Sequence, residues 1–358
     1  MSEILLQMRN VTKRFPGVVA LKNVNLELHQ QEILGICGEN GAGKSTLMKV
    51  LSGSYGASEY EGELLIHGTP VRFTDVHDAQ AQGIEMVYQE MNMMLDASIA
   101  ENLFVGNLPQ RRGFVDYKKL YADSAKLLAQ VHLELDPRMP VRPLNSGQMQ
   151  LLSLMRAVAK KPKILVLDEP TTALTDQEVD VLMEILAQLR QSGVSCLYIS
   201  HKLEELYRIC DRVCVMNQGK SSEPVPVKEL FTTPISREAA YLSGCKNFSD
   251  AAVAEKGEVM ALDWGITLKC DTAGKEDSNS VGVRSHFIHP VSADKKDSMS
   301  NVFSCKIKRI IEDVFSYILI VSPQEGAQIR VDVSKEEWLE YREQMTGDEI
   351  LIGIEEKD

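Results

Sequence analysis

The sequence predicts an α/β fold built on a parallel sheet, followed by a smaller, mainly β domain. A glycine-rich loop lies between an apolar run and a helix-like run at residues 32–53. A second apolar run, residues 164–167, ends in two acidic residues. Beyond residue 300 the chain has short, β-rich, partly alternating runs. At 358 residues the chain has room for two domains, which we place at residues 1–235 and 236–358.

Composition and charge disfavour several classes of function. The net charge of −12, from 51 acidic and 39 basic residues, disfavours nonspecific nucleic-acid binding by the whole surface. The sequence has no apolar run of the ~20 residues that a membrane-spanning helix needs, and its first residues lack a signal-peptide pattern. The seven cysteines are scattered without metal-binding spacing, which predicts reduced, structural thiols.

The loop GENGAGKS is the first segment whose residues indicate a chemical function. Residues 32–37 predict a buried strand before it, and the helix-like run after it closes at Gly53. Gly38, Gly43, Lys44 and Ser45 satisfy the pattern G-x-x-x-x-G-K-[ST]. Backbone amides and the helix start would cradle phosphates, Lys44 would reach the terminal phosphates, and Ser45 would bind Mg2+. The predicted nucleotide-binding residues of this segment are Gly38, Glu39, Asn40, Gly41, Ala42, Gly43, Lys44, Ser45 and Thr46.

The run KILVLDEP predicts a second buried strand, whose end carries Asp168 and Glu169. Strand ends in parallel sheets of this kind face the ligand. Alone, the two acids fit a solvated strand end equally well, but the upstream loop favours a site. Asp168 would then hold Mg2+, and Glu169 would be the general base toward the attacking water.

Three further segments complete an ordered set. They are MVYQE, which contains Gln89, then LNSGQ at residues 144–148, then CLYISHKLEEL, which contains His201. With the loop and the acidic strand end, they resemble the ATP-binding subunit of ABC transporters over residues 3–235. The resemblance implies a P-loop NTPase of the ABC ATPase type, with a RecA-like core and a helical subdomain.

The resemblance also implies roles for single residues. Gln89 would contact Mg2+ and sense the membrane partner, and His201 would contact the γ-phosphate. Phe15, in VTKRFPGVVAL, would stack on adenine. Taken singly, Gln89 and His201 would be read as satisfied polar residues near strand ends, and only the order of the motifs favours the functional reading.

The LNSGQ segment is expected to serve a second copy of the chain. In the family two copies close head to tail around two ATP molecules, so Ser146, Gly147 and Gln148 would contact the nucleotide of the partner. The implied partners are this second ATP-binding subunit, two transmembrane permease subunits and, indirectly, a solute-binding protein, with no nucleic acid. The implied location is peripheral, on the cytoplasmic face of the inner membrane.

Two departures from the usual family pattern indicate a branch. Asn145 stands where L-S-x-G-Q has serine, and Thr175 stands where an aspartate usually follows Ala-Leu, with Asp176 next. Both departures, and the stretch YQEMNMMLDASIAENLFVG, resemble importer ATPases for sugars such as ribose, xylose and galactose. Those proteins usually carry two cassettes, whereas no second glycine-lysine loop follows residue 220 here.

The tail carries a different resemblance. Residues 221–234 are polar and proline-bearing and predict a connector. YLSGCKNF, ALDWGITL, VGVRSHFIHP and SMSNVFSCKIKRI resemble the C-terminal region of molybdate-type oxyanion importers. The strand-like runs predict a small OB-like barrel with one helix-like insert, KEEWLEYREQM, and a loop at residues 293–300. A structural or dimerising role competes with anion sensing, for which Arg284, His286 and His289 are the candidates.

These observations favour an ATP-hydrolysing subunit of a bacterial-type importer. The N-terminal resemblance indicates a sugar as cargo, and the tail indicates a molybdate-like oxyanion. A soluble ABC ATPase acting on nucleic acid or ribosomes is disfavoured by the acidic charge and the single cassette. A catalytically weak soluble regulator is disfavoured by the presence of Glu169.

Overall fold

The computed structural model of the protein describes residues 3–90, 92–232, 234, 236–255, 257–270, 279–292, 299–342 and 347–355. Contacts divide the chain into two compact units, Met1–Thr232 and Thr233–Asp358, which we call the first and the second unit.

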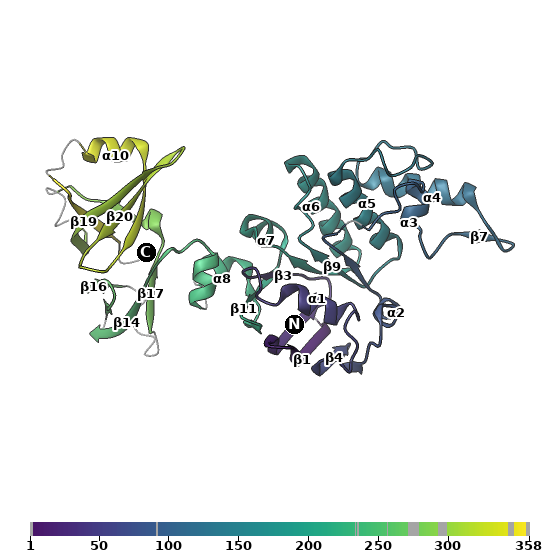
Figure 1. The fold of residues 1–358 in the computed structure, drawn as a ribbon, viewed down its shortest axis with the longest axis horizontal. Coiled ribbons are helices and arrows are strands. Elements are labelled where there is room, and N and C mark those ends of the chain that lie inside the picture. Colours follow the sequence, from purple (N-terminus) through teal and green to yellow (C-terminus); the bar gives the residue numbers. More distant parts are fainter. Residues whose placement is uncertain are drawn as a thin grey trace. The chain divides into compact units, whose positions relative to one another are not determined.

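The centre of the first unit is a sheet with strand order β12-β11-β3-β10-β9-β6, and the strands from β11 to β6 run parallel (Figure 1). Strands β3 and β10 are buried along their whole length, as expected of a parallel sheet covered on both faces. Its strands are β3 (Ile33–Cys37), β6 (Ile84–Val87), β9 (Ile164–Asp168), β10 (Ser195–Ile199), β11 (Arg212–Asn217), β12 (Lys220–Ser221) and β13 (Val225–Pro226), which pairs with β11.

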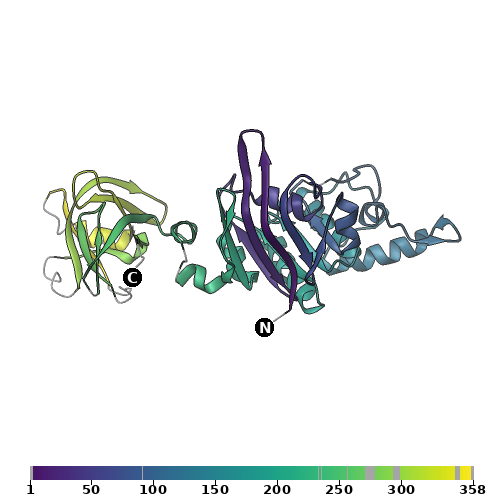
Figure 2. The same ribbon diagram turned by 90° about the horizontal axis from the view of Figure 1, so that it is seen from below.

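A second sheet of the first unit is antiparallel, with order β2-β1-β4-β5. Figure 2 shows β1 and β2, in purple, as a long pair. Side chains of β2 alternate between buried and exposed along much of its length, which is the pattern of a sheet with one solvated face. The strands are β1 (Ile4–Phe15), β2 (Val18–His29), β4 (Glu61–Ile66) and β5 (Thr69–Val71).

Helices cover the central sheet and also form a separate group. Helices α3, α4 and α5 pack against one another, and α5 also contacts β6. A short hairpin of β7 and β8 belongs to the same region. The elements of this group are α3 (Ile99–Leu103), β7 (Gln110–Arg111), β8 (Phe114–Val115), α4 (Tyr117–Gln130) and α5 (Ser146–Ala159). The other helices of the first unit are α1 (Lys44–Leu51), α2 (Val76–Ala81), α6 (Asp176–Gln191), α7 (Leu203–Ile209) and α8 (Val227–Thr232).

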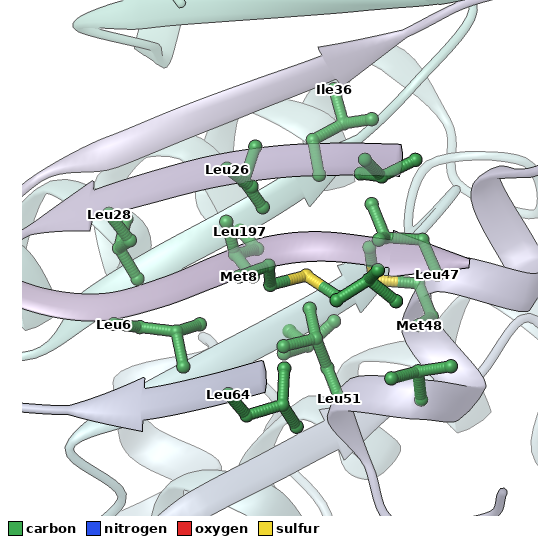
Figure 3. Packing of buried hydrophobic residues seen from close by; sticks show 14 of the residues in the cluster. Leu6, Met8, Leu26, Leu28, Ile36, Leu47, Met48, Leu51, Leu64 and Leu197 are labelled. Carbon is green, nitrogen blue, oxygen red and sulfur yellow. The ribbon is translucent and has the colours of Figure 1, made fainter. Parts of the chain in front are cut away.

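Helix α1 is packed in one apolar core that both sheets share (Figure 3). Leu47, Met48 and Leu51 of α1 are fully buried in it. Burial of a large apolar side chain contributes about 1.5–3 kcal/mol, so α1 is firmly held, and with it the loop that precedes it. The other labelled members of this core are Leu6, Met8, Leu26, Leu28, Ile36, Leu64 and Leu197.

The segment predicted as a connector is largely structured. Residues 225–226 form β13, which pairs with β11, and α8 buries Val227 and Leu230. The segment predicted as a connector, residues 221–234, is therefore strand and helix over most of its length, and the boundary between the two units falls within it, after Thr232. Local composition does not reveal the pairing of β13 with β11. Among the described residues, no helix is long and apolar enough to span a membrane.

The second unit consists of two antiparallel sheets around one core. Their orders are β16-β15-β14-β17 and β18-β22-β19-β20-β21. The core includes Trp264 and Trp338 and draws on both sheets. The elements are α9 (Arg237–Leu242), β14 (Asn247–Glu255), β15 (Glu258–Ala261), β16 (Ile266–Lys269), β17 (Ser280–Val283), η1 (Ser285–Phe287), β18 (Ile288–Pro290), β19 (Asn301–Glu312), β20 (Ser316–Ser322), β21 (Ile329–Ser334), α10 (Lys335–Arg342) and β22 (Glu349–Ile354).

The strand-like runs predicted after residue 300 correspond to β19, β20, β21 and β22, and the helix-like insert corresponds to α10. The predicted loop at residues 293–300 lies mostly outside the described residues, because these resume at residue 299.

Two buried asparagines join the two sheets of the second unit. Asn247 of β14 donates to the carbonyl of Arg330 in β21 and accepts from its amide, both at 2.7 Å. Asn301 of β19 makes the same pair of bonds with Lys269 of β16, at 2.9 and 2.7 Å. Each side chain thereby replaces one rung of a β-ladder between strands of different sheets, so the two sheets nearly close into a barrel.

We expect Asn247→Asp to destabilise the second unit by about 1–3 kcal/mol, because a carboxylate cannot donate to the buried carbonyl of Arg330. Both tryptophans of the chain, Trp264 and Trp338, are buried in this unit. Urea unfolding of the full chain followed by tryptophan fluorescence therefore reports on it selectively. The exposed Asn279→Asp is the matched control; equal stability of the two variants would contradict the sheet-joining role.

Candidate nucleotide site

The glycine-rich loop joins β3 to α1 and depends on glycine at two positions. Gly43, which caps α1, has a φ of 105°, and an added Cβ would lie 2.5 Å from the carbonyl oxygen of Ala20. At Gly38 an added Cβ would collide with the carbonyl oxygen of Met216. The loop can therefore keep its tight path only with glycine at these positions.

Lys44 lies inside the loop. Its side chain is buried, and its ammonium donates to the carbonyl oxygens of Gly38 at 2.7 Å and Glu39 at 3.0 Å. Ser45 is exposed, and Thr46 is half-buried. Of the remaining loop residues, Glu39, Asn40 and Gly41 are exposed, whereas Ala42 is buried. The ammonium is thus held among backbone carbonyls, which an incoming phosphate would replace as its partners.

The register of the central sheet brings the predicted polar residues to one edge. Ile199 pairs with both Ile36 of β3 and Asp168 of β9, and Val87 of β6 pairs with Leu167 of β9. The glycine loop, Glu169, His201 and Gln89 each follow within two residues of one of these strands. The chain thus places them along the same carboxyl edge of the parallel strands, where ligands bind in such sheets. Gln89 is exposed there.

Glu169 and His201 are in direct contact. The Nδ1 atom of His201 lies 3.1 Å from Oε1 of Glu169. The histidine side chain is 55% exposed, while that of Glu169 is only 17% exposed. Glu169 has a φ of 46°, uncommon for a residue with a side chain, and its amide donates to the carbonyl of Ile199 at 3.0 Å. The backbone is therefore held in a conformation that turns the carboxylate toward the histidine.

Asp168, at the end of β9, is partly buried next to another acid, and both features disfavour its charged form. Burial raises the pKa of its carboxyl group, and the neighbouring Glu169 raises it further, while Lys44 and Lys49 oppose the shift. Two carboxylates are thus adjacent with incomplete compensation by cations. Such a pair of oxygen donors suits a hard divalent cation such as Mg2+.

The LNSGQ segment starts α5. Asn145 is its N-cap: its Oδ1 accepts from the backbone amide of Gln148 at 2.7 Å, and Oε1 of Gln148 accepts from the backbone amide of Asn145 at 3.1 Å. Ser146 is exposed. Gly147 is buried against the carboxylate of Glu178, and any side chain at that position would collide with it. Glu178 in turn completes the capping box of α6 with Thr175.

Phe15 ends β1 and is half-buried. Its ring meets that of Tyr55 edge-on, with centroids 5.7 Å apart. The ammonium of Lys13 lies 5.1 Å from the centroid of the Phe15 ring. Sequence reasoning singled out Phe15 but neither of these two neighbours.

Comparisons with known proteins agree with this arrangement. Residues 21–172 match the family model described as ABC transporter. A solved structure of a nucleotide-free ATP-binding cassette from an ABC transporter is similar at a TM-score of 0.57 and 22% identity, over 67% of this chain and 98% of that one. The dimeric cassette MJ0796, bound to ADP and Pi, gives a TM-score of 0.55 at 24% identity, over 62% and 99% of the two chains.

The first unit has the fold of an ATP-binding cassette.

Curated relatives are similar in sequence over this cassette. The xylose import ATP-binding protein XylG of Moorella thermoacetica is 43% identical over 71% of this chain and 51% of its own length. The galactose/methyl galactoside import ATP-binding protein MglA of Pasteurella multocida is 42% identical over 63% of this chain and 44% of its own length. The chain spans about half the length of the curated relatives it matches.

The cassette contains a buried acid that sequence reasoning missed. Glu205 of α7 accepts from Thr171 at 2.6 Å, Tyr198 at 2.9 Å and Ser200 at 3.0 Å, and Lys202 lies 3.1 Å away. Thr171 follows Glu169 by two residues, and Ser200 directly precedes His201. The Glu205 carboxylate therefore links the two chain segments that carry Glu169 and His201. Burial and the charge of Glu205 raise the pKa of Tyr198 far above its usual range, which keeps its hydroxyl a donor.

Of the three candidate anion residues of the second unit, His289 has an acidic neighbour. His289 lies 3.6 Å from the carboxylate of Glu337. Arg284 donates to the hydroxyl of Ser243 at 3.2 Å and is half-buried. His286 is exposed, and its ring packs on Phe287 at 4.4 Å between centroids. The carboxylate beside His289 disfavours an anion there.

Proposed function

We propose that this chain is the ATP-binding and ATP-hydrolysing subunit of an ABC importer whose cargo is a sugar. The observation that carries the proposal is the contact between Glu169 and His201 at the sheet edge that also carries the phosphate loop. The names of the relatives, import ATP-binding proteins for xylose and for galactose, support a sugar as cargo.

In this proposal the loop amides and Lys44 hold the phosphates of ATP. Ser45, Asp168 and Gln89 would hold Mg2+, which neutralises phosphate charge when bound. The pair of neighbouring carboxylates at Asp168 and Glu169, which nearby cations compensate only in part, supports that fit. The ring of Phe15 stacks on adenine.

Glu169 is the general base that orients and deprotonates the attacking water, and His201 contacts the γ-phosphate. The observed contact would let each side chain fix the orientation of the other before water and phosphate enter. A carboxylate kept mostly from solvent, as Glu169 is, interacts more strongly with a neighbouring proton than an exposed one.

Ser146, Gly147 and Gln148 contact the nucleotide of a second copy, so that two cassettes close around two ATP molecules. The assembly would contact two permease subunits from the cytoplasmic face of the membrane, and a solute-binding protein would deliver the cargo to these permeases. We place the domain boundary at residues 235/236, and the mainly β domain that follows it would be an accessory domain. Its OB-like barrel closure and its resemblance to oxyanion importers remain predictions.

The experiment is Lys44→Ala in the full chain, with ATP binding measured by calorimetry. Loss of a charge-assisted contact to phosphate should weaken binding by about 10- to 100-fold. Lys22→Ala, at an exposed position of β2, is the matched control and should bind as the wild type does. Wild-type affinity in Lys44→Ala would refute the nucleotide site.

A further inference from the structure

We infer that Lys13 and Tyr55 are positioning residues, which hold the ring of Phe15 ready for the adenine of ATP. The inference rests on the proposed function, in which Phe15 stacks on the base. It adds a support behind that ring, which neither the motifs nor the family resemblance indicated.

The first observation is the buried cation. Lys13 is only 4% exposed. Its ammonium donates to the backbone carbonyl of Glu59 at 2.9 Å and to the carboxylate of Glu59 at 3.1 Å. It also lies 4.3 Å from the centroid of the Tyr55 ring and 5.1 Å from that of Phe15. Both distances lie within the ~6 Å reach of a cation–π contact, so the cation is shared by two rings and one acid.

The second observation concerns stability. The pair that Lys13 forms with Glu59 is open to solvent on the acid side, since the Glu59 side chain is 48% exposed. Such a pair contributes little net stability, whereas burying the ammonium of Lys13 costs solvation free energy. Packing alone therefore gives no reason for an ammonium at residue 13. An ammonium does give directional support to a ring, since it attracts the ring face.

The third observation places this cluster beside the phosphate loop. Phe15 pairs with Val18 across the turn between β1 and β2. Ala20, two residues further along β2, lies so close to the loop that its carbonyl oxygen excludes any side chain at Gly43. Val18, the strand partner of Phe15, is thus about two strand residues, or roughly 7 Å, along β2 from the residue that touches the phosphate loop.

The two rings and the cation fit one task. Lys13 lies over the Phe15 ring, the rings of Tyr55 and Phe15 are in edge-to-face contact, and Phe15 is only half-buried, so part of it stays open to a ligand. A side chain at the end of a hairpin would otherwise sample several rotamers, and a base that stacked on it would have to immobilise it. Fixing the ring beforehand lowers that cost of binding.

The test compares ligands with and without a base. Full-length Lys13→Met and Tyr55→Leu are titrated by calorimetry with ADP and with pyrophosphate, neither of which needs the hydrolytic step. We expect ADP to bind about 5- to 10-fold more weakly, in line with the worth of one base–aromatic stack, while pyrophosphate binds as to the wild type. Tyr55→Phe, which keeps the ring, and Lys22→Met, at an exposed position of β2, should match the wild type.

The pyrophosphate titration also shows that a variant is folded. Equal weakening of ADP and pyrophosphate, or no weakening of ADP, would overturn the inference. Failure of the proposed function would give a different result. The wild type would then bind neither ligand, or Lys44→Ala would bind both ligands as well as the wild type does. Either result would also overturn the inference about Lys13 and Tyr55.

Discussion

Glu169→Gln is expected to lower the ATP turnover number by about 10²- to 10⁴-fold, the contribution of a positioned general base, while ATP still binds. The amide keeps the shape of the side chain and its contact distance to His201, but it cannot accept a proton from water. Without turnover, ATP should hold two copies together, which size-exclusion chromatography with and without ATP would detect as a dimer.

Glu204→Gln is the matched control, because Glu204 is an exposed glutamate of α7 in the same unit. It should hydrolyse ATP at the wild-type rate and should not accumulate an ATP-bound dimer. If Glu169→Gln hydrolysed ATP as fast as this control, Glu169 would not be the base.

Glu205→Ala is expected to lower the free energy of unfolding of the cassette by about 3–5 kcal/mol, because each buried hydroxyl left without an acceptor costs about 1–3 kcal/mol. Its loss removes the acceptor of the buried hydroxyls of Thr171, Tyr198 and Ser200. Both tryptophans lie in the second unit, so urea unfolding followed by far-ultraviolet circular dichroism, compared with tryptophan fluorescence, isolates the cassette.

The same residue predicts a dependence on pH. Burial raises the pKa of Glu205, but its hydrogen bonds from Thr171, Tyr198, Lys202 and Ser200 outweigh burial and leave the pKa lowered. The folded state thus favours the carboxylate. Its contribution is complete above the unfolded-state pKa of about 4.3 and is lost as pH falls through the lower folded-state pKa.

Glu205→Gln should therefore be less stable than the wild type at neutral pH, and the gap should narrow as the pH falls below about 4.3. Glu204→Gln should show no gap at neutral pH, because its side chain is exposed. A gap for Glu205→Gln that stayed constant down to acid pH would contradict the charged network.

Local patterns were enough to predict the strands that carry the candidate site. The strand before the glycine loop and the acidic strand were predicted to within a residue of β3 and β9, because short apolar runs bounded by polar residues have few other interpretations. The strands and the helix after residue 300 were predicted for the same reason. The placement of His201 required the order of the motifs, since its own neighbourhood fits any polar residue at a strand end.

The residues that support the site side chains from behind could not be predicted from the local sequence. Lys13 and Glu59 are 46 residues apart, and Thr171 and Glu205 are 34 apart. Charged side chains are predicted to be exposed unless a partner is known, so a buried acid and a buried lysine both look like surface residues in the sequence. The pairing of β13 with β11 was missed for a different reason, because a two-residue strand is too short to show the alternation of a strand.

The cap at Asn145 has a consequence for the chemistry of the LNSGQ segment. An asparagine amide has one oxygen that accepts and one nitrogen that donates, and here the oxygen is already engaged by the amide of Gln148. The orientation of the group is thereby decided, since the nitrogen must occupy the other side. A serine hydroxyl in its place could turn to accept or to donate. The group that Asn145 has left for a phosphate is an NH2, which only donates, and a phosphate oxygen only accepts.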